Sequence, residues 1–279
     1  MLTKSFSEEC KALYEEGLSL REVGANLRVS KDTVMVSLLK NGFPLRSKRK
    51  AAKVALKRGK VFGHEFHNVK EDFFKSWTRE MAYVLGYLFA DGSLLARRRG
   101  ANFSFCGKEK ELVEKIGRLL EYKEPARYSF NRGYGLWTIN INRVEMVEDL
   151  KRLGFSSPRG AAMKFPEIPL EYLRDFIRGY FEGDGCVRVY CRDRLEVNFA
   201  SCSREFLGRL EDLLRRIGMS HRKLYNAGLT SAGNMLYKLA YRKQPDIRSF
   251  CRFLYSDTPD EMVWEKKREK FRRSWWKSE

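Results

Sequence analysis

Two aspartates in a repeated motif are the residues of this sequence best suited to chemistry. Asp91 lies in the segment GYLFADG, and Asp184 lies 93 positions later in the segment GYFEGDG. Two carboxylates held close together repel each other, and a site relieves this by raising a pKa or by binding cations. Oxygen ligands beside phosphate groups suit Mg²⁺, and metal ions there activate water and stabilise a leaving oxygen. The pair therefore predicts metal-dependent hydrolysis of a phosphodiester.

Two helices are the elements that must bring these acids together. Each motif lies at the C-terminal end of an apolar stretch with a helical pattern, and each stretch stops at a glycine. Small residues four apart, Gly86 with Ala90 and Gly179 with Gly183, share one helix face, which lets two backbones approach closely. We expect the two helices to pack on each other about a pseudo-two-fold axis. The alternative interpretation is a seam that serves packing alone.

The likeness between the two halves continues beyond the motif. Residues 103–120 align with residues 197–214 at an offset of 94, and residues 136–143 align with residues 236–243 at an offset of 100. Each half has the pattern of helix, two strands, helix, two strands, helix. We expect an α+β fold built as a pseudo-two-fold αββαββα tandem repeat. Its halves would span residues 77–168 and 169–279, the second ending in a basic helix that packs on it or, alternatively, lies on a membrane surface.

Apolar and polar residues alternate along the expected strands. Val187, Val189 and Cys191 alternate with polar neighbours, as do Leu195, Val197 and Phe199. This period places apolar residues against helices and leaves a polar face of the kind that reads bases and phosphates, or simply a solvated face. The candidate DNA contacts on these strands and turns are Arg97, Arg98, Arg99, Asn131, Arg132, Thr138, Asn140, Asn142, Arg188, Tyr190, Arg192, Arg194, Asn198, Lys238 and Arg242.

Residues 1–45 predict a separate small all-α domain. Ser19 with Glu22 forms a capping-box pattern, and Ser30 is placed to cap a further helix. The order of helix, helix, tight turn and helix is that of a helix-turn-helix, and LSLREVGANLRVSKDTV resembles such domains in resolvases and invertases. The alternative is a helical bundle for protein contact. Candidate DNA contacts are Lys31 and Thr33, with Arg46, Lys48, Arg49 and Lys50 in a basic linker over 46–76.

Charge and composition restrict the partner. The 279 residues carry 55 Lys+Arg and 36 Asp+Glu, a formal net charge of +19. This surplus favours a polyanion, although a membrane surface or an acidic protein would also satisfy it. No apolar run approaches the ~20 residues that span a bilayer, and no signal peptide is evident. We expect a cytoplasmic or nucleoid-associated protein that does not bind membranes. A zinc site has little support, because there are three His and no C-x-x-C pair.

The two motif copies, each followed by strand pairs, resemble the LAGLIDADG homing endonucleases in their single-chain form. The resemblance covers about residues 77–265. It implies that Asp91 and Asp184 bind Mg²⁺, or Mn²⁺ in its place, with the backbone carbonyls of Ala90 and Gly183. It further implies a monomer whose two four-stranded sheets form a saddle over a long asymmetric site in double-stranded DNA, with cleavage of both strands.

The same resemblance suggests catalytic partners for the aspartates. The family places a basic residue just past the second strand of each half, and Lys108 fits this role. The second half has Cys202 where a lysine is expected, so Arg204 is the candidate there and unequal cleavage of the two strands is an expectation. Relatives of this fold also act as DNA-binding regulators without cleavage or as maturases that bind intron RNA. Because both aspartates are present, we favour the nuclease.

Overall fold

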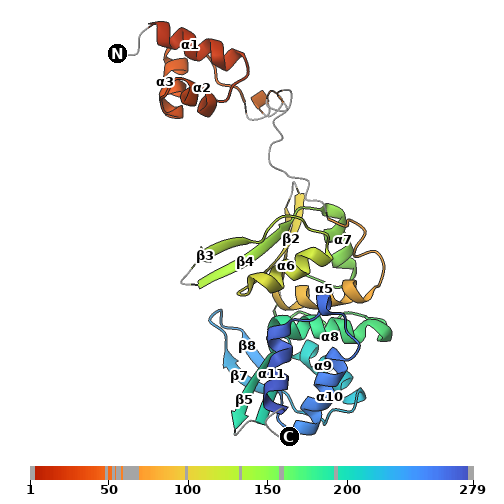
Figure 1. The fold of residues 1–279 in the computed structure, drawn as a ribbon. Coiled ribbons are helices and arrows are strands. Elements are labelled where there is room, and N and C mark those ends of the chain that lie inside the picture. Colours follow the sequence, from red (N-terminus) through yellow and green to blue (C-terminus); the bar gives the residue numbers. More distant parts are fainter. Residues whose placement is uncertain are drawn as a thin grey trace. The chain divides into compact units, whose positions relative to one another are not determined.

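A computed structural model describes residues 4–47, 50, 51, 54, 58, 69–97, 100–131, 134–156, 160–191 and 194–275. It divides into two compact units, Met1–Phe66 and His67–Glu279 (Figure 1).

Three short helices surround a small apolar core in the described part of unit 1. They are α1 (Lys4–Glu15), α2 (Leu20–Asn26) and α3 (Lys31–Lys40). The predicted caps are confirmed: the Glu22 amide donates to Ser19 Oγ, the Glu22 carboxylate accepts from the Ser19 amide, and Ser30 Oγ accepts from the Thr33 amide. Residues from all three helices are buried together in the core: Cys10, Tyr14, Leu18, Val23, Val34 and Leu38. Residues 7–45 therefore fold as the predicted arrangement of helices.

Unit 2 repeats one order of elements twice, as predicted (Figure 1). The first half contains α5 (Arg79–Asp91), β1 (Gly92–Arg97), β2 (Gly100–Gly107), α6 (Lys110–Leu119), β3 (Arg127–Asn131), β4 (Tyr134–Ile141) and α7 (Val144–Arg152). The second contains α8 (Leu170–Asp184), β5 (Cys186–Cys191), β6 (Arg194–Ser201), α9 (Arg204–Arg216), β7 (Tyr225–Leu229), β8 (Met235–Tyr241) and α10 (Gln244–Tyr255). Each half forms an antiparallel four-stranded sheet, in the orders β1-β2-β4-β3 and β5-β6-β8-β7. The expected α+β tandem repeat is confirmed.

The alternation along the strands predicts most of the buried face correctly. Leu195, Val197 and Phe199 are buried against the helices, together with Ile139 and Ile141 of the first half. Val189 is an error of the prediction, since 63% of its surface is exposed. It lies on the edge strand β5, where the pairing with β6 shifts register between Val189 and Cys191.

A second error concerns the polar face of β6. Asn198 is only 5% exposed and its neighbour Glu196 is 0% exposed, although both alternate with core residues and point to the other face. Other polar side chains on that face cover them, as described below. Alternation therefore identifies the face of a side chain but not its exposure.

The second half continues into a further segment, and the described part of the first half has no equivalent of it. It consists of a short helix, η1 (Asp260–Met262), and the basic helix α11 (Glu265–Trp275). Trp264 and Phe271 are buried, and Phe271 contacts the ring of Phe181 on α8. The expected packing of this basic helix on the second half is confirmed. Within the described part of the chain, no helix has the length and apolar character required to cross a membrane.

Candidate active site

The two motif helices pack directly on each other between the halves of unit 2 (Figure 1). A Cβ atom added to Gly86 would overlap the carbonyl oxygen of Phe176 on α8, and one added to Gly179 would overlap the carbonyl oxygen of Tyr83 on α5. The helix axes are therefore as close as the backbones allow, and only glycine fits at these two positions. This confirms the helix contact predicted from the small residues.

Asp91 and Asp184 are the last residues of the two helices. Gly92 and Gly185 follow them as extended C-caps, and their amides donate to the carbonyls of Leu88 and Phe181. A Cβ on either glycine would meet the last turn of its own helix. Each helix consequently ends abruptly and enters a strand, which leaves an aspartate at the junction.

Both aspartates line one cavity of about 440 Å³. The first half contributes Asp91 and Ser93, and the second half contributes Asp184, Ser201 and Cys202. Asp91 is half-buried, whereas Asp184 is exposed. The repeat thus brings the two acids to one site, as the sequence predicts.

The Asp91 carboxylate lies close to the end of the opposite helix. Asp91 Oδ2 lies 3.3 Å from the position that a Cβ on Gly183 would occupy. The absence of a side chain at Gly183 therefore leaves the carboxylate against the backbone of the opposite helix. Among the described residues there is no cluster of three or more His, Cys, Asp or Glu side chains that could hold a metal ion. A metal ion here would take two carboxylates and complete its shell with backbone carbonyls and water.

Tyr87 is a buried residue of α5, one helical turn before Asp91. Its hydroxyl donates to the Cys106 carbonyl oxygen at 3.1 Å. Burial raises the pKa of this phenol well above its usual value, and the charges of Asp91 and Asp184 add to the effect. Tyr87 is consequently neutral and holds β2 against α5.

Most of the second half matches the model of a known protein family. Residues 171–254, which run from α8 to α10, match the family described as LAGLIDADG-like domain. Over these residues the second half resembles a LAGLIDADG-like domain.

Solved structures and curated proteins also resemble this chain. The homing endonuclease I-WcaI bound to its DNA recognition sequence is 14% identical, with 73% of this chain and 93% of that chain covered and a TM-score of 0.48. I-DmoI in complex with DNA and Ca is 12% identical, with 66% and 95% covered and a TM-score of 0.46.

The curated relatives share a segment with this chain. Elongation factor 2 of Methanopyrus kandleri is 28% identical over 148 residues, which are 50% of this chain and 11% of that protein. DNA-directed RNA polymerase subunit Rpo1C of Methanocaldococcus jannaschii is 28% identical over 158 residues, which are 55% of this chain and 17% of that protein. The chain therefore spans less than a fifth of the length of either relative.

The predicted catalytic cations lie outside the cavity. Lys108 follows β2 and Arg204 begins α9, and both are exposed. Neither is among the residues described as lining the cavity, whereas Cys202 is. In the second half, a cysteine therefore lines the cavity at the position expected to hold a lysine.

The predicted DNA contacts on the sheets have different surroundings. Asn140, Asn142, Arg188, Arg194 and Arg242 are exposed, while Thr138 and Lys238 are half-buried. Arg97 lies in β1, Asn131 in β3 and Tyr190 in β5. Arg98, Arg99, Arg132 and Arg192 lie outside the described residues, as do Lys48 and Arg49 of the linker.

In unit 1 the predicted contacts divide into surface and structural residues. Lys31 and Lys50 are exposed, and Thr33 is half-buried at the start of α3. Arg46 donates to the carbonyls of Tyr14 and Leu18 at 2.6 Å, and its guanidinium lies 3.8 Å from the centre of the Tyr14 ring. This guanidinium closes the C-terminal end of α1, so its position does not favour a DNA contact.

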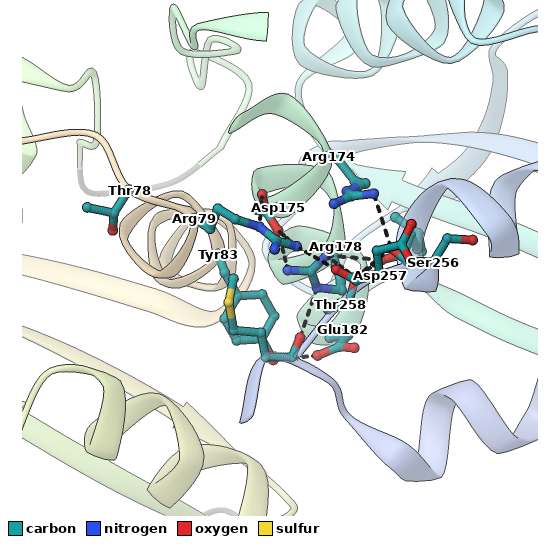
Figure 2. A network of polar contacts seen from close by, with 12 residues as sticks. Thr78, Arg79, Tyr83, Arg174, Asp175, Arg178, Glu182, Ser256, Asp257 and Thr258 are labelled. Carbon is teal, nitrogen blue, oxygen red and sulfur yellow. Dashed lines mark hydrogen bonds and ion pairs between the residues drawn. The ribbon is translucent and has the colours of Figure 1, made fainter. Parts of the chain in front are cut away.

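A buried polar network lies along α8 of the second half (Figure 2). Arg178 is 0% exposed and donates to Asp175 and to the carbonyls of Leu254 and Met262 at 2.5–3.0 Å. Glu182 accepts from the Tyr83 hydroxyl at 2.5 Å and from the Trp264 amide at 2.8 Å. Burial raises the pKa of Glu182, although these two hydrogen bonds oppose the shift. Glu182 is thus a structural acid.

Lys267 of α11 closes the C-terminal end of the same helix. Its Nζ donates to the carbonyls of Phe181, Glu182 and Gly185 at 2.6–2.9 Å. Burial lowers its pKa to about 8, against the opposing effect of the Glu182 carboxylate. A cation at a helix C-terminus compensates the carbonyl dipoles there, so α11 fixes the turn that carries Asp184.

Sequence reasoning missed several residues of the cavity and its support. Ser93 and Ser201 line the cavity beside the acids. The sequence held a signal for both, since Ser93 directly follows the first motif and Ser201 directly precedes Cys202, where a lysine is expected. Lys267 and Arg178 gave no such signal, because charged residues are expected at the surface.

Proposed function

We propose that the protein is a site-specific endonuclease that hydrolyses phosphodiesters in double-stranded DNA with a divalent metal ion. One observation carries the proposal: the two motif aspartates line a single cavity at the junction of the helices α5 and α8. The family of the second half and the net charge of +19 support DNA as the substrate.

The residues at the junction fit a hard divalent cation. Asp91 and Asp184 would hold it with the carbonyls of Ala90 and Gly183, because Mg²⁺ and Mn²⁺ prefer oxygen ligands. A Cβ at position 183 would overlap the Cβ of Ala90 and lie 3.3 Å from Asp91 Oδ2, so glycine there lets the two helix ends approach each other beside the acids. When bound, the metal would supply Lewis acidity toward the scissile phosphate and its attacking water.

The chain's own residues would position the substrate. Exposed arginine and asparagine side chains on both sheets would contact bases and phosphates on either side of the cavity. Lys108 and Arg204 lie at the surface after β2 and β6, where they would contact phosphates near the scissile bond. We further propose a monomer, in which unit 1 extends the DNA contact through α3.

The test begins with the mapping of cleavage sites. Purified full-length protein is incubated with DNA of its source and Mg²⁺, and new DNA ends are located by sequencing. A supercoiled plasmid carrying a mapped site then reports nicked and linear products over time. We expect Asp91→Asn and Asp184→Asn each to lower the cleavage rate by about 10²-fold or more, because metal activation supplies several kcal/mol, and EDTA to stop the reaction.

Asp212→Asn is the matched control. Asp212 is 49% exposed and pairs with Arg215 on α9, so its change should leave the rate within a factor of two. DNA binding without any cleavage by the wild-type protein would support a regulator instead. An RNA-splicing activity that survives both aspartate changes would support a maturase. Accumulation of nicked plasmid ahead of the linear product would support the expected unequal cleavage of the two strands.

A further inference from the structure

A carboxylate is buried on the face of the second sheet that is available to DNA. Arg188 on β5 pairs in register with Glu196 on β6, and Arg242 follows Tyr241 of β8, which pairs with Val197. The three side chains therefore form one row across the sheet. Arg188 Nε donates to Glu196 Oε1 at 3.0 Å, and Arg242 Nε donates to Glu196 Oε2 at 2.6 Å. Asn198 adds a third hydrogen bond, from Nδ2 to Oε1 at 3.0 Å.

This arrangement separates the acid from solvent but keeps the two arginine side chains accessible. The Glu196 side chain is 0% exposed, whereas Arg188 is 53% and Arg242 is 50% exposed. Burial acts to raise the pKa of Glu196, but the two guanidinium groups outweigh it and hold the pKa below its usual value. A carboxylate can read cytosine only by accepting a hydrogen bond from its amino group, and a fully covered carboxylate cannot do so. Glu196 therefore contributes through its hydrogen bonds to Arg188 and Arg242 rather than by contacting DNA.

The neighbours gain a fixed geometry. Two guanidinium groups near each other repel, and each long side chain has many rotamers. Each oxygen of the Glu196 carboxylate accepts from one arginine, which offsets the repulsion between the guanidinium groups and restricts their rotamers. The row keeps one net positive charge. Strands two positions apart in a sheet are separated by about 9.5 Å, and the major groove is about 12 Å wide. Both arginines can therefore enter one groove together.

The first half lacks this device. The register of its strands places Leu95 opposite Asn102, and Asn142 follows Ile141, which pairs with Phe103. The equivalent row therefore contains one apolar side chain and two amides, without a carboxylate or a guanidinium. The pinned arginine pair is a property of the second half.

We propose that Glu196 is a positioning residue that presents Arg188 and Arg242 as a fixed pair of guanine readers in the major groove. A guanidinium donates two hydrogen bonds to O6 and N7 of guanine, which is the commonest specific contact of arginine with DNA. The inference rests on the proposed function, since it names what the second half recognises. The target half-site bound by the second half would then contain guanine at two positions.

The experiment is a binding selection with full-length protein and EDTA, so that cleavage does not interfere. The probe is a library of double-stranded DNA with a randomised segment of about 30 bp, which is roughly three helical turns. The wild-type protein should select a motif with two strongly preferred guanines. Glu196→Gln should lower the preference at both positions by roughly 10-fold, while binding to unselected DNA is unchanged or stronger because a negative charge is lost.

Single changes at the arginines assign the two positions while Glu196 keeps its charge and one of its two arginine partners. Arg188→Lys and Arg242→Lys keep the charge but lose the planar fork, so each should relax one guanine position only. Arg215→Lys is the matched control, because Arg215 is 57% exposed and pairs with an acid on α9, and it should leave the motif unaltered.

The outcomes separate the inference from the proposed function. A wild-type protein that selects no motif contradicts sequence-specific recognition itself. A motif whose guanines keep their full preference in Glu196→Gln and in both lysine variants overturns the inference alone. An equal loss of affinity for every sequence in Glu196→Gln, with a lower thermal unfolding midpoint, also overturns it, because that result describes a structural acid.

Discussion

Helices α5 and α8 occupy equivalent places in the two halves but bury different chemistry. At an offset of 93 residues, three buried positions are apolar in α5 and charged in α8. The pairs are Ala82 and Asp175, Leu85 and Arg178, and Phe89 and Glu182. Both sets are compatible with one close helix contact, because the charged set is hydrogen-bonded (Figure 2).

The difference follows from what each helix must hold. Arg178 donates to the carbonyls of Leu254 and Met262. Glu182 accepts from the amide of Trp264. Leu254 is in the last turn of α10, whereas Met262 and Trp264 belong to the segment between α10 and α11. The described part of the first half has no element equivalent to that segment. Buried charges thus mark the place where an addition to a duplicated fold is attached, whereas the half without the addition uses apolar packing.

The largest loss of stability should come from replacing Arg178 of α8 with leucine, the residue at the equivalent position of α5. Arg178→Leu leaves Asp175 buried near Arg79 alone and removes donors from two carbonyls. Loss of one partner of a buried pair costs about 3–5 kcal/mol. Urea unfolding of the full chain, followed by circular dichroism, measures this change.

A double variant sharpens the comparison. Asp175→Ala combined with Arg178→Leu restores the apolar pair of α5 and removes the uncompensated acid. It should be less destabilised than Arg178→Leu alone, because replacing both partners is often nearly neutral. A double variant that is less stable than the single one would show that Asp175 contributes through Arg79 instead.

The next effect concerns a feature that both halves share. Gly86→Ala and Gly179→Ala each place a Cβ on a backbone carbonyl of the opposite helix, and overpacking of this kind costs about 1–3 kcal/mol. Equal losses for the two variants would show a symmetric seam. Thermal unfolding of each purified variant gives the comparison.

Gly208→Ala is the matched control for these two. Gly208 lies within α9, and a Cβ there meets nothing within 4 Å. Alanine favours a helix over glycine by up to about 1 kcal/mol, so this variant should be as stable as the wild type or more stable. A destabilised control would mean that the glycine seam is not the cause of the losses above.

The smallest expected effect is the pH dependence of stability that Glu196, the buried acid of the second sheet, contributes. Because the folded-state pKa of Glu196 lies below its usual value, its contribution is present above about pH 4.3, the unfolded value, and is lost as pH falls through the folded value. The arginines are half exposed, so the loss should be at most about 1 kcal/mol. Urea unfolding at pH 7 and at pH 3 should show a larger decrease for wild type than for Glu196→Gln, and an equal decrease would contradict the ion-paired carboxylate.

The sequence predicts the helices, the sheets and the meeting of Asp91 with Asp184, since small-residue spacing and alternation are local patterns. It does not predict the exposure of Glu196 or Asn198. Their burial depends on arginines from two other strands, and that depends on register. The same holds for Arg178 and Lys267, whose partners are carbonyl groups that carry no sequence signature. The positions of Lys108 and Arg204 relative to a scissile bond depend on bound DNA and stay predictions.

The contact of Lys267 has a consequence in time. The ammonium group that caps the helix of Asp184 lies 82 residues after Gly185 in the chain. At about 5–20 residues per second of synthesis, a ribosome needs about 4–16 s to reach it. During this interval a nascent chain holds both acids of the motif, but the helix end that carries the second one is still without its cap.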